Sequence, residues 1–132
     1  MKKYFPILYI ISSSIIAPSQ NNPKAVKHFQ NFAYPKVVET LSNAKTLALD
    51  NKRQLAYSYA LAGNYLKAEE LWKGIVSENS KSPSDIYEYA QVLKSNGKYE
   101  ESDSVMKTYA ELVGSETRVK LYSENTQYYK DL

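Results

Sequence analysis

Few residues in this sequence could carry catalytic or metal chemistry. There is one histidine, His28, and no cysteine, so thiolate chemistry and a multi-histidine metal site lack their ligands. The adjacent pairs Glu69-Glu70 and Glu100-Glu101 suggest acid and base catalysis, but neighbouring residues of a helix point about 100 degrees apart and do not face each other. We therefore expect no enzymatic activity, no metal and no cofactor, with His28 in a structural or surface position and both pairs on solvated helix faces.

Composition favours one modest globular domain and argues against a nucleic-acid partner. The 132 residues are 43% hydrophobic and 23% charged, which is ordinary for a folded protein. The 17 basic residues are interleaved with 14 acidic ones, and no cluster of Lys and Arg could neutralise a row of phosphates. The absence of cysteine permits an oxidising compartment without demonstrating one.

An internal repeat supplies the elements that would position a binding site. Three anchors recur at an offset of 34 residues: Ala56 with Ala90, Gly63 with Gly97, and Tyr65 with Tyr99. Thirty-four residues is the period of the tetratricopeptide repeat (TPR), a pair of antiparallel helices. In such a pair the small residue allows close helix approach, the glycine ends the first helix in a left-handed conformation, and the aromatic residue fills the turn.

Positions counted from each tyrosine predict the buried face of the second helix in each repeat. They are Ala68, Trp72 and Ile75 in one repeat and Ser102, Met106 and Tyr109 in the next. A degenerate upstream copy has Tyr34 followed by Val37, Leu41 and Ala44, with Phe32 where the glycine would stand. The sequence therefore predicts an all-α fold of about three TPR-like hairpins, stacked as a short right-handed solenoid.

Helix boundaries follow from capping residues. Ser82-Pro83 predicts a helix start with a serine cap, and Asp50 predicts a cap for the helix after it. Gly114 marks the end of the last hairpin. The expected helices span roughly residues 24–32, 35–48, 51–62, 65–78, 83–96 and 99–113, within a repeat domain of residues 20–114.

The C-terminal segment 115–132 is expected to cover the end of the stack. Ser115 would cap a short helix over residues 115–122, with Val119 and Tyr122 facing the last hairpin. A terminal hairpin otherwise leaves an apolar face in water. Residues 123–132 are polar and are expected to be irregular.

The N-terminal residues 1–19 have the order of a secretory signal peptide. Lys2 and Lys3 precede a short apolar run, and Ala17 and Ser19 would occupy the −3 and −1 positions of a cleavage site between Ser19 and Gln20. The run is short and broken by Pro6 and three serines, which disfavours a membrane span. We expect cleavage and a periplasmic protein, although a retained anchor or a packed apolar helix remains open.

The first helix of each repeat has a second face that would line the concave groove of the stack. Candidate protein-binding residues on this face are Arg53, Tyr57, Tyr87, Gln91 and Lys94. An ordinary solvated helix face remains an equally good interpretation.

Four segments carry a resemblance to a known family: residues 32–38, 63–69, 89–94 and 97–102. They closely resemble the N-terminal repeat region of OmpA family cell-envelope proteins from the Bacteroidetes, flavobacteria especially, and the match covers nearly the whole chain. The resemblance implies a periplasm-facing module that binds a protein or peptide of the cell envelope, with outer-membrane association through that partner. Family members continue into a β-propeller-like region and a peptidoglycan-binding domain; this chain stops at Leu132, so peptidoglycan binding is not carried over.

Two further points limit what the resemblance implies. TPR domains that hold C-terminal carboxylates use a clamp of Lys, Asn and Arg, and Arg53, Tyr57, Tyr87 and Gln91 do not reproduce it. The alternative function is a structural spacer or truncated fragment that packs on a neighbouring envelope domain without a ligand of its own.

Overall fold

The computed structural model describes residues 21–80, 82–114 and 116–132, without the side chains of residues 116–119. The described residues form helices and no strands, which confirms the expected all-α fold. The helices are α2 (Pro23–Gln30), α3 (Tyr34–Leu41), α4 (Leu49–Leu61), α5 (Tyr65–Glu78), α6 (Pro83–Ser95), α7 (Tyr99–Val113) and α8 (Glu116–Lys130). The signal-peptide prediction for residues 1–19 and the Ser115 cap lie outside the described residues.

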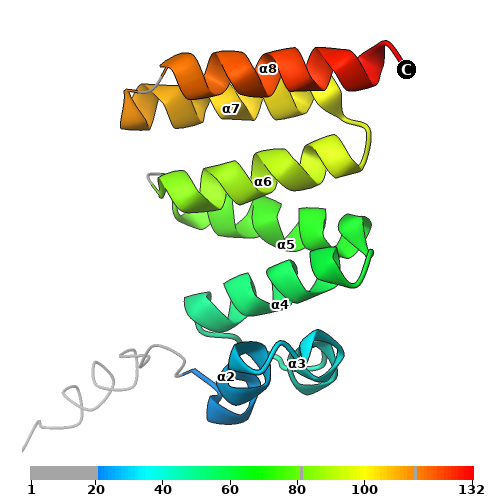
Figure 1. Ribbon diagram of the computed structural model, residues 1–132. Coiled ribbons are helices and arrows are strands. Elements are labelled where there is room, and N and C mark those ends of the chain that lie inside the picture. The colour runs from blue at the N-terminus through cyan, green and yellow to red at the C-terminus, as the bar shows by residue number, and fades with distance from the viewer. Residues whose placement is uncertain (1–20, 81, 115) are drawn as a thin grey trace, which may run out of the picture.

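The helices pack in chain order (Figure 1). The pairs α2 with α3, α4 with α5, and α6 with α7 form helical hairpins, and each hairpin contacts the next through α3 and α4 or through α5 and α6. The last helix, α8, packs on α7. This stacking brings α4 and α6 to one side of the molecule, where both run in the same direction (Figure 1).

The turns inside the three hairpins share one geometry. Gly63 and Gly97 have positive φ angles of 81° and 76°, and Phe32 has a φ of 57° at the equivalent place. The Asn64 backbone N–H donates to the Tyr59 carbonyl at 2.8 Å, the long bond of a Schellman motif. Equivalent bonds join Ala33 to His28 and Lys98 to Leu93. Phe32 therefore adopts the backbone conformation that glycine adopts in the other two hairpins.

Replacing Phe32 with glycine is expected to stabilise the protein. A left-handed backbone costs a residue with a Cβ roughly 1 kcal/mol, and the Phe32 ring is 75% exposed, so little packing is lost. We expect Phe32→Gly to raise the free energy of unfolding by about 0.5 to 1 kcal/mol in urea denaturation. Phe32→Ala, which removes the ring and keeps the strain, is the control; an equal gain from alanine would show that strain is not the cause.

The core lies between successive hairpins and uses the positions that the repeat predicted. Ala56 and Ala90 are fully buried, as is Ala68, and the other second-helix positions are also buried: Trp72, Ile75, Ser102, Met106 and Tyr109. In the first hairpin Val37 and Leu41 are buried and pack with Ala25 and Leu55. One turn residue departs from its expected packing, since Tyr65 is 39% exposed.

The expected second helix of the first hairpin is too long. Helix α3 ends at Leu41 instead of residue 48, and Ala44 is exposed. The apolar face of this segment ends at Leu41. Leu47, which precedes α4, and Leu49, its first residue, pack against the buried clusters. A helix continued through residues 42–46 would bury almost no further apolar surface.

Of two predicted caps, Asp50 is wrong and Ser82 is correct in its position only. Helix α4 begins at Leu49 after Ala48, so Asp50 lies inside its first turn and pairs with Arg53 instead of capping. Helix α6 begins at Pro83 as predicted, but the Ser82 side chain makes no capping hydrogen bond and lies 3.3 Å from the Ser84 hydroxyl.

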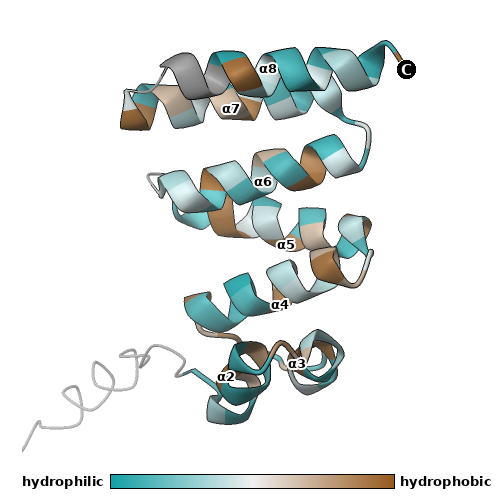
Figure 2. Cartoon of the chain, in the orientation of Figure 1, coloured by the Kyte–Doolittle hydropathy of each residue, from teal (hydrophilic) through white to brown (hydrophobic). Residues whose placement is uncertain are grey.

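The C-terminal segment is more ordered than its polarity suggested. Helix α8 continues to Lys130, so the prediction of an irregular tail over residues 123–132 is wrong. Thr126 is fully buried one turn after Tyr122, and its hydroxyl donates to the Tyr122 carbonyl at 2.9 Å. Tyr122 faces the last hairpin as expected, while the Val119 side chain lies outside the described residues. Most of the coloured residues of α8 are hydrophilic (Figure 2), which suits a helix at the end of a stack.

Candidate functional site

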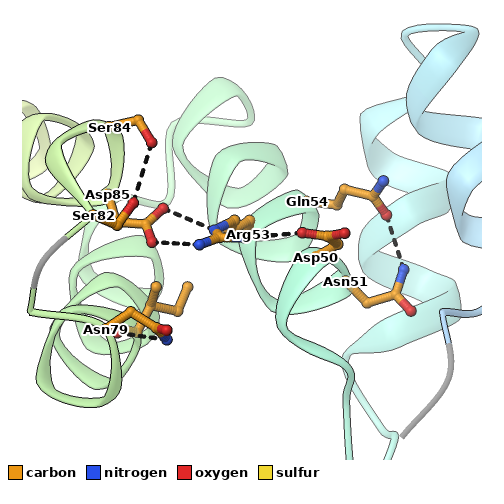
Figure 3. A network of polar contacts seen from close by, with 9 residues as sticks. Asp50, Asn51, Arg53, Gln54, Asn79, Ser82, Ser84 and Asp85 are labelled. Carbon is orange, nitrogen blue, oxygen red and sulfur yellow. Dashed lines mark hydrogen bonds and ion pairs between the residues drawn. The ribbon is translucent and has the colours of Figure 1, made fainter.

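Arg53 ties α4 to α6. Its Nε and Nη2 donate to the two carboxylate oxygens of Asp85 at 2.8 and 2.7 Å, and its Nη1 donates to Asp50 at 2.9 Å (Figure 3). The Asp85 side chain is only 3% exposed. The hydrogen bonds from Arg53 to Asp85 and Asp50 raise the pKa of Arg53 above its ordinary value, although burial opposes this. Arg53 is therefore a paired group that joins two successive hairpins.

Tyr57 borders an apolar pocket between α2 and α4. Its ring is 37% exposed and lies edge-on to the rings of Phe29 and Tyr34, with centroids 5.7 and 6.2 Å apart. The pocket has a volume of about 400 Å³ and is also lined by Val26 and Arg53. A tyrosine held by aromatic neighbours at the edge of an apolar pocket is well suited to contact a partner side chain.

Gln91 and Lys94 border a second pocket, between α6 and α8. It has a volume of about 440 Å³, and Asn125 and Tyr129 of α8 form its opposite wall. The Lys94 ammonium group donates to the Asn125 side chain and lies 4.6 and 5.3 Å from the ring centroids of Tyr122 and Tyr129. Burial lowers the pKa of Lys94, and the Asp103 carboxylate opposes that effect. Lys94 therefore holds α8 by cation–π contacts.

Tyr87 packs against the core between α6, α7 and α8. Its ring centroid is 5.7 Å from that of Tyr109 and 6.5 Å from that of Tyr122. The side chain is half-buried against the cluster of Ile86 and Met106. Tyr87 therefore contributes to the packing of α8 on the last hairpin.

The structure thus places the five candidate binding residues in three separate surroundings. Arg53 and Tyr57 share the α2/α4 pocket, Gln91 and Lys94 share the α6/α8 pocket, and Tyr87 packs between the last helices. Sequence reasoning missed Asn125 and Tyr129 because it expected an irregular tail. The segment offers no local signal for them, because Tyr122 and Thr126 are recognised as one helix face only once their burial is known.

Glu69 was expected on a solvated face, and this is wrong. Its side chain is only 14% exposed and accepts hydrogen bonds at 2.6 Å from both Lys98 and Asn96. Burial raises the pKa of Glu69, but these two donors outweigh it and the net pKa is lowered. The carboxylate joins α5 to the turn between α6 and α7. Glu70, Glu100 and Glu101 are exposed as predicted.

The lone histidine lies among lysines on the first hairpin. His28 is half-buried beside Lys24, Lys36 and Glu39. Within residues 21–80, 82–114 and 116–132, no three His, Asp or Glu side chains gather closely enough to hold a metal ion. None of the described helices is both long and apolar enough to cross a membrane.

In a comparison with known proteins, the sequence matches no protein-family model and no curated protein.

Proposed function

We propose that this protein is a TPR-type scaffold that binds a segment of another protein along the face formed by α2, α4 and α6. The observation that carries the proposal is the apolar pocket between α2 and α4, where Tyr57 and Phe29 stand beside the paired charges of Arg53. A concave site lined by aromatic residues with a few polar groups is the usual form of a protein or peptide site. The 34-residue interval between two left-handed glycines in equivalent turns supports the TPR assignment.

We further propose export to the periplasm as a module of a cell envelope protein similar to the OmpA family. This rests on the signal-like N-terminus and the sequence resemblance. Fractionation of source cells, with antiserum against residues 20–132, tests it: a periplasmic or outer-membrane band is expected, and a cytoplasmic band alone would contradict it.

The alternative is a spacer that packs on a neighbouring envelope domain and has no ligand of its own. One observation favours it: Arg53, Tyr87 and Lys94 make their main contacts inside the stack. Under this alternative the polar groups of the candidate face serve only to join the hairpins.

Site-specific cross-linking separates the two functions. The photoreactive residue p-benzoylphenylalanine replaces Tyr57 in one full-length variant and the exposed Lys107 of α7 in the control. Irradiation of living cells is expected to give a discrete adduct from position 57 and none from position 107. Absence of an adduct at 57, or equal adducts at both positions, would contradict a binding site at the α2/α4 pocket.

A further inference from the structure

A second carboxylate, Glu88, lies on the side of α6 that faces α4. It follows Asp85 by three residues, so the two side chains are neighbours on the helix surface, and the Asp85 charge acts on Glu88. Asp85 reaches across to Arg53 of α4. Because α4 and α6 run in the same direction (Figure 1), Glu88 follows Asp85 along α6 by about one turn, as Tyr57 follows Arg53 along α4.

Unlike Asp85, Glu88 has no cationic partner among the residues that the structure describes. It is half-buried and makes no hydrogen bond or ion pair with any residue that the structure describes. Burial raises its pKa, and the neighbouring Asp85 carboxylate raises it further. A partly desolvated carboxylate without a counter-charge destabilises a fold. Residues that cost stability in this way are concentrated at functional sites.

The charges around Glu88 are unbalanced. Asp50, Asp85 and Glu88 supply three carboxylates, and the guanidinium of Arg53 binds the first two. Lys94 lies at the other end of the face, enclosed by Tyr122 and Tyr129. Of these three carboxylates, Glu88 is therefore the one that Arg53 does not bind.

We propose that Glu88 pairs with a Lys or Arg side chain of the bound protein segment, and that the pocket beside Tyr57 takes an apolar side chain next to that cation. The inference rests on the proposed function and names the chemistry of its partner, a cationic segment with adjacent apolar residues. Charge complementarity gives specificity and register to such a segment. The Glu88 carboxylate would repel an acidic one.

The stability of Glu88→Gln first tests whether the carboxylate is an uncompensated charge. A raised pKa in the folded state means that the acid contributes stability below its unfolded pKa, and that this contribution is lost as pH rises through the folded pKa. Glutamine stays neutral throughout. Glu88→Gln should therefore raise the urea midpoint at pH 7 and leave it nearly unchanged at pH 4.

Glu111→Gln, at an exposed position of α7, is the matched control and should have no effect at either pH. Lower stability of Glu88→Gln at pH 7 would show that the carboxylate already has a partner, and would overturn the proposal.

Binding is tested with three soluble peptides in which leucine alternates with a second residue. That second residue is arginine in the first peptide, citrulline in the second and glutamate in the third. In NMR titrations of the full chain, the arginine peptide is expected to shift the amide resonances of Tyr57 and Glu88. Glu88→Gln should weaken that binding about tenfold. Equal binding of the citrulline or glutamate peptide at this face, or no binding of the arginine peptide, would overturn the proposal.

The closing experiment combines Glu88→Gln with the photoreactive residue at position 57. If the natural partner brings a cation to Glu88, the adduct yield in cells falls severalfold. A full adduct yield would refute the cationic partner while leaving the proposed function in place. Loss of the adduct even with Glu88 present would instead refute the proposed function.

Discussion

Arg53→Ala is expected to lower the free energy of unfolding by about 3 kcal/mol, because it leaves the carboxylate of Asp85 buried without its partner. The Asp85 side chain is 3% exposed and receives both of its ionic hydrogen bonds from Arg53. Hydration cannot replace these bonds without opening the contact between α4 and α6. Urea denaturation followed by far-ultraviolet circular dichroism measures the effect.

Two further variants distinguish the buried pair from a general effect of mutation. Arg53→Lys keeps the charge but cannot form the two-pronged bond, so it should recover only part of the loss. The double variant Arg53→Met with Asp85→Leu removes both charges and should be more stable than Arg53→Ala. A loss below about 0.5 kcal/mol in Arg53→Ala, the range of ordinary surface substitutions, would show that Asp85 does not depend on Arg53.

This result affects how binding experiments are read. A loss of partner capture in Arg53→Ala would not by itself identify a contact residue, since the same change loosens two hairpins. Tyr57 and Glu88 are better probes: Tyr57 is 37% exposed, and removal of the Glu88 charge is expected to stabilise the fold.

Tyr122→Ala is expected to cost about 3 kcal/mol and to detach α8 from the last hairpin. The Tyr122 ring is 8% exposed and packs with Met106 and Tyr109. Its hydroxyl lies 2.6 Å from the hydroxyl of Ser102, which itself donates to the Ala90 carbonyl at 2.7 Å. Because stacked repeats open from their ends, hydrogen exchange should rise throughout residues 120–130 and much less in α4 and α5.

The controls for this prediction lie on the same helix. Tyr122→Phe keeps the ring and loses only the hydroxyl contact, for an expected cost of about 1 kcal/mol. Tyr128→Ala changes a ring that is 61% exposed and should alter stability by less than about 0.5 kcal/mol. Unchanged exchange in α8 of Tyr122→Ala would show that other contacts hold this helix.

Local pattern was sufficient for most of the helices. The spacing of Gly63 and Gly97 predicted two equivalent hairpins, and the positions counted from their tyrosines are the buried ones. Phe32 was also placed correctly, at the point where the chain needs a positive φ. These predictions succeed because turn geometry and helical periodicity act over fewer than about ten residues.

The end of the chain shows where local pattern is insufficient. Residues 123–132 are polar, and their helix depends on Tyr122 and Thr126 meeting a surface formed by α6 and α7. At residue 102 the repeat has serine where its counterpart at 68 is alanine, and the Ser102 hydroxyl contacts the Tyr122 hydroxyl and the Ala90 carbonyl. Neither contact is visible in the segment alone.

The candidate binding face also combines features set by local pattern with features set by tertiary contacts. The sequence by itself determined the helical repeat, the buried positions and the side of each first helix that carries Arg53, Tyr57, Gln91 and Lys94, because these follow from periodicity. Only the tertiary structure decided that Arg53 is bound by Asp85, that Lys94 is enclosed by α8, and that Glu88 has no partner among the described residues. The physical reason is that pairing and desolvation depend on which side chains of distant helices meet, and charge patterns within one helix do not contain that information.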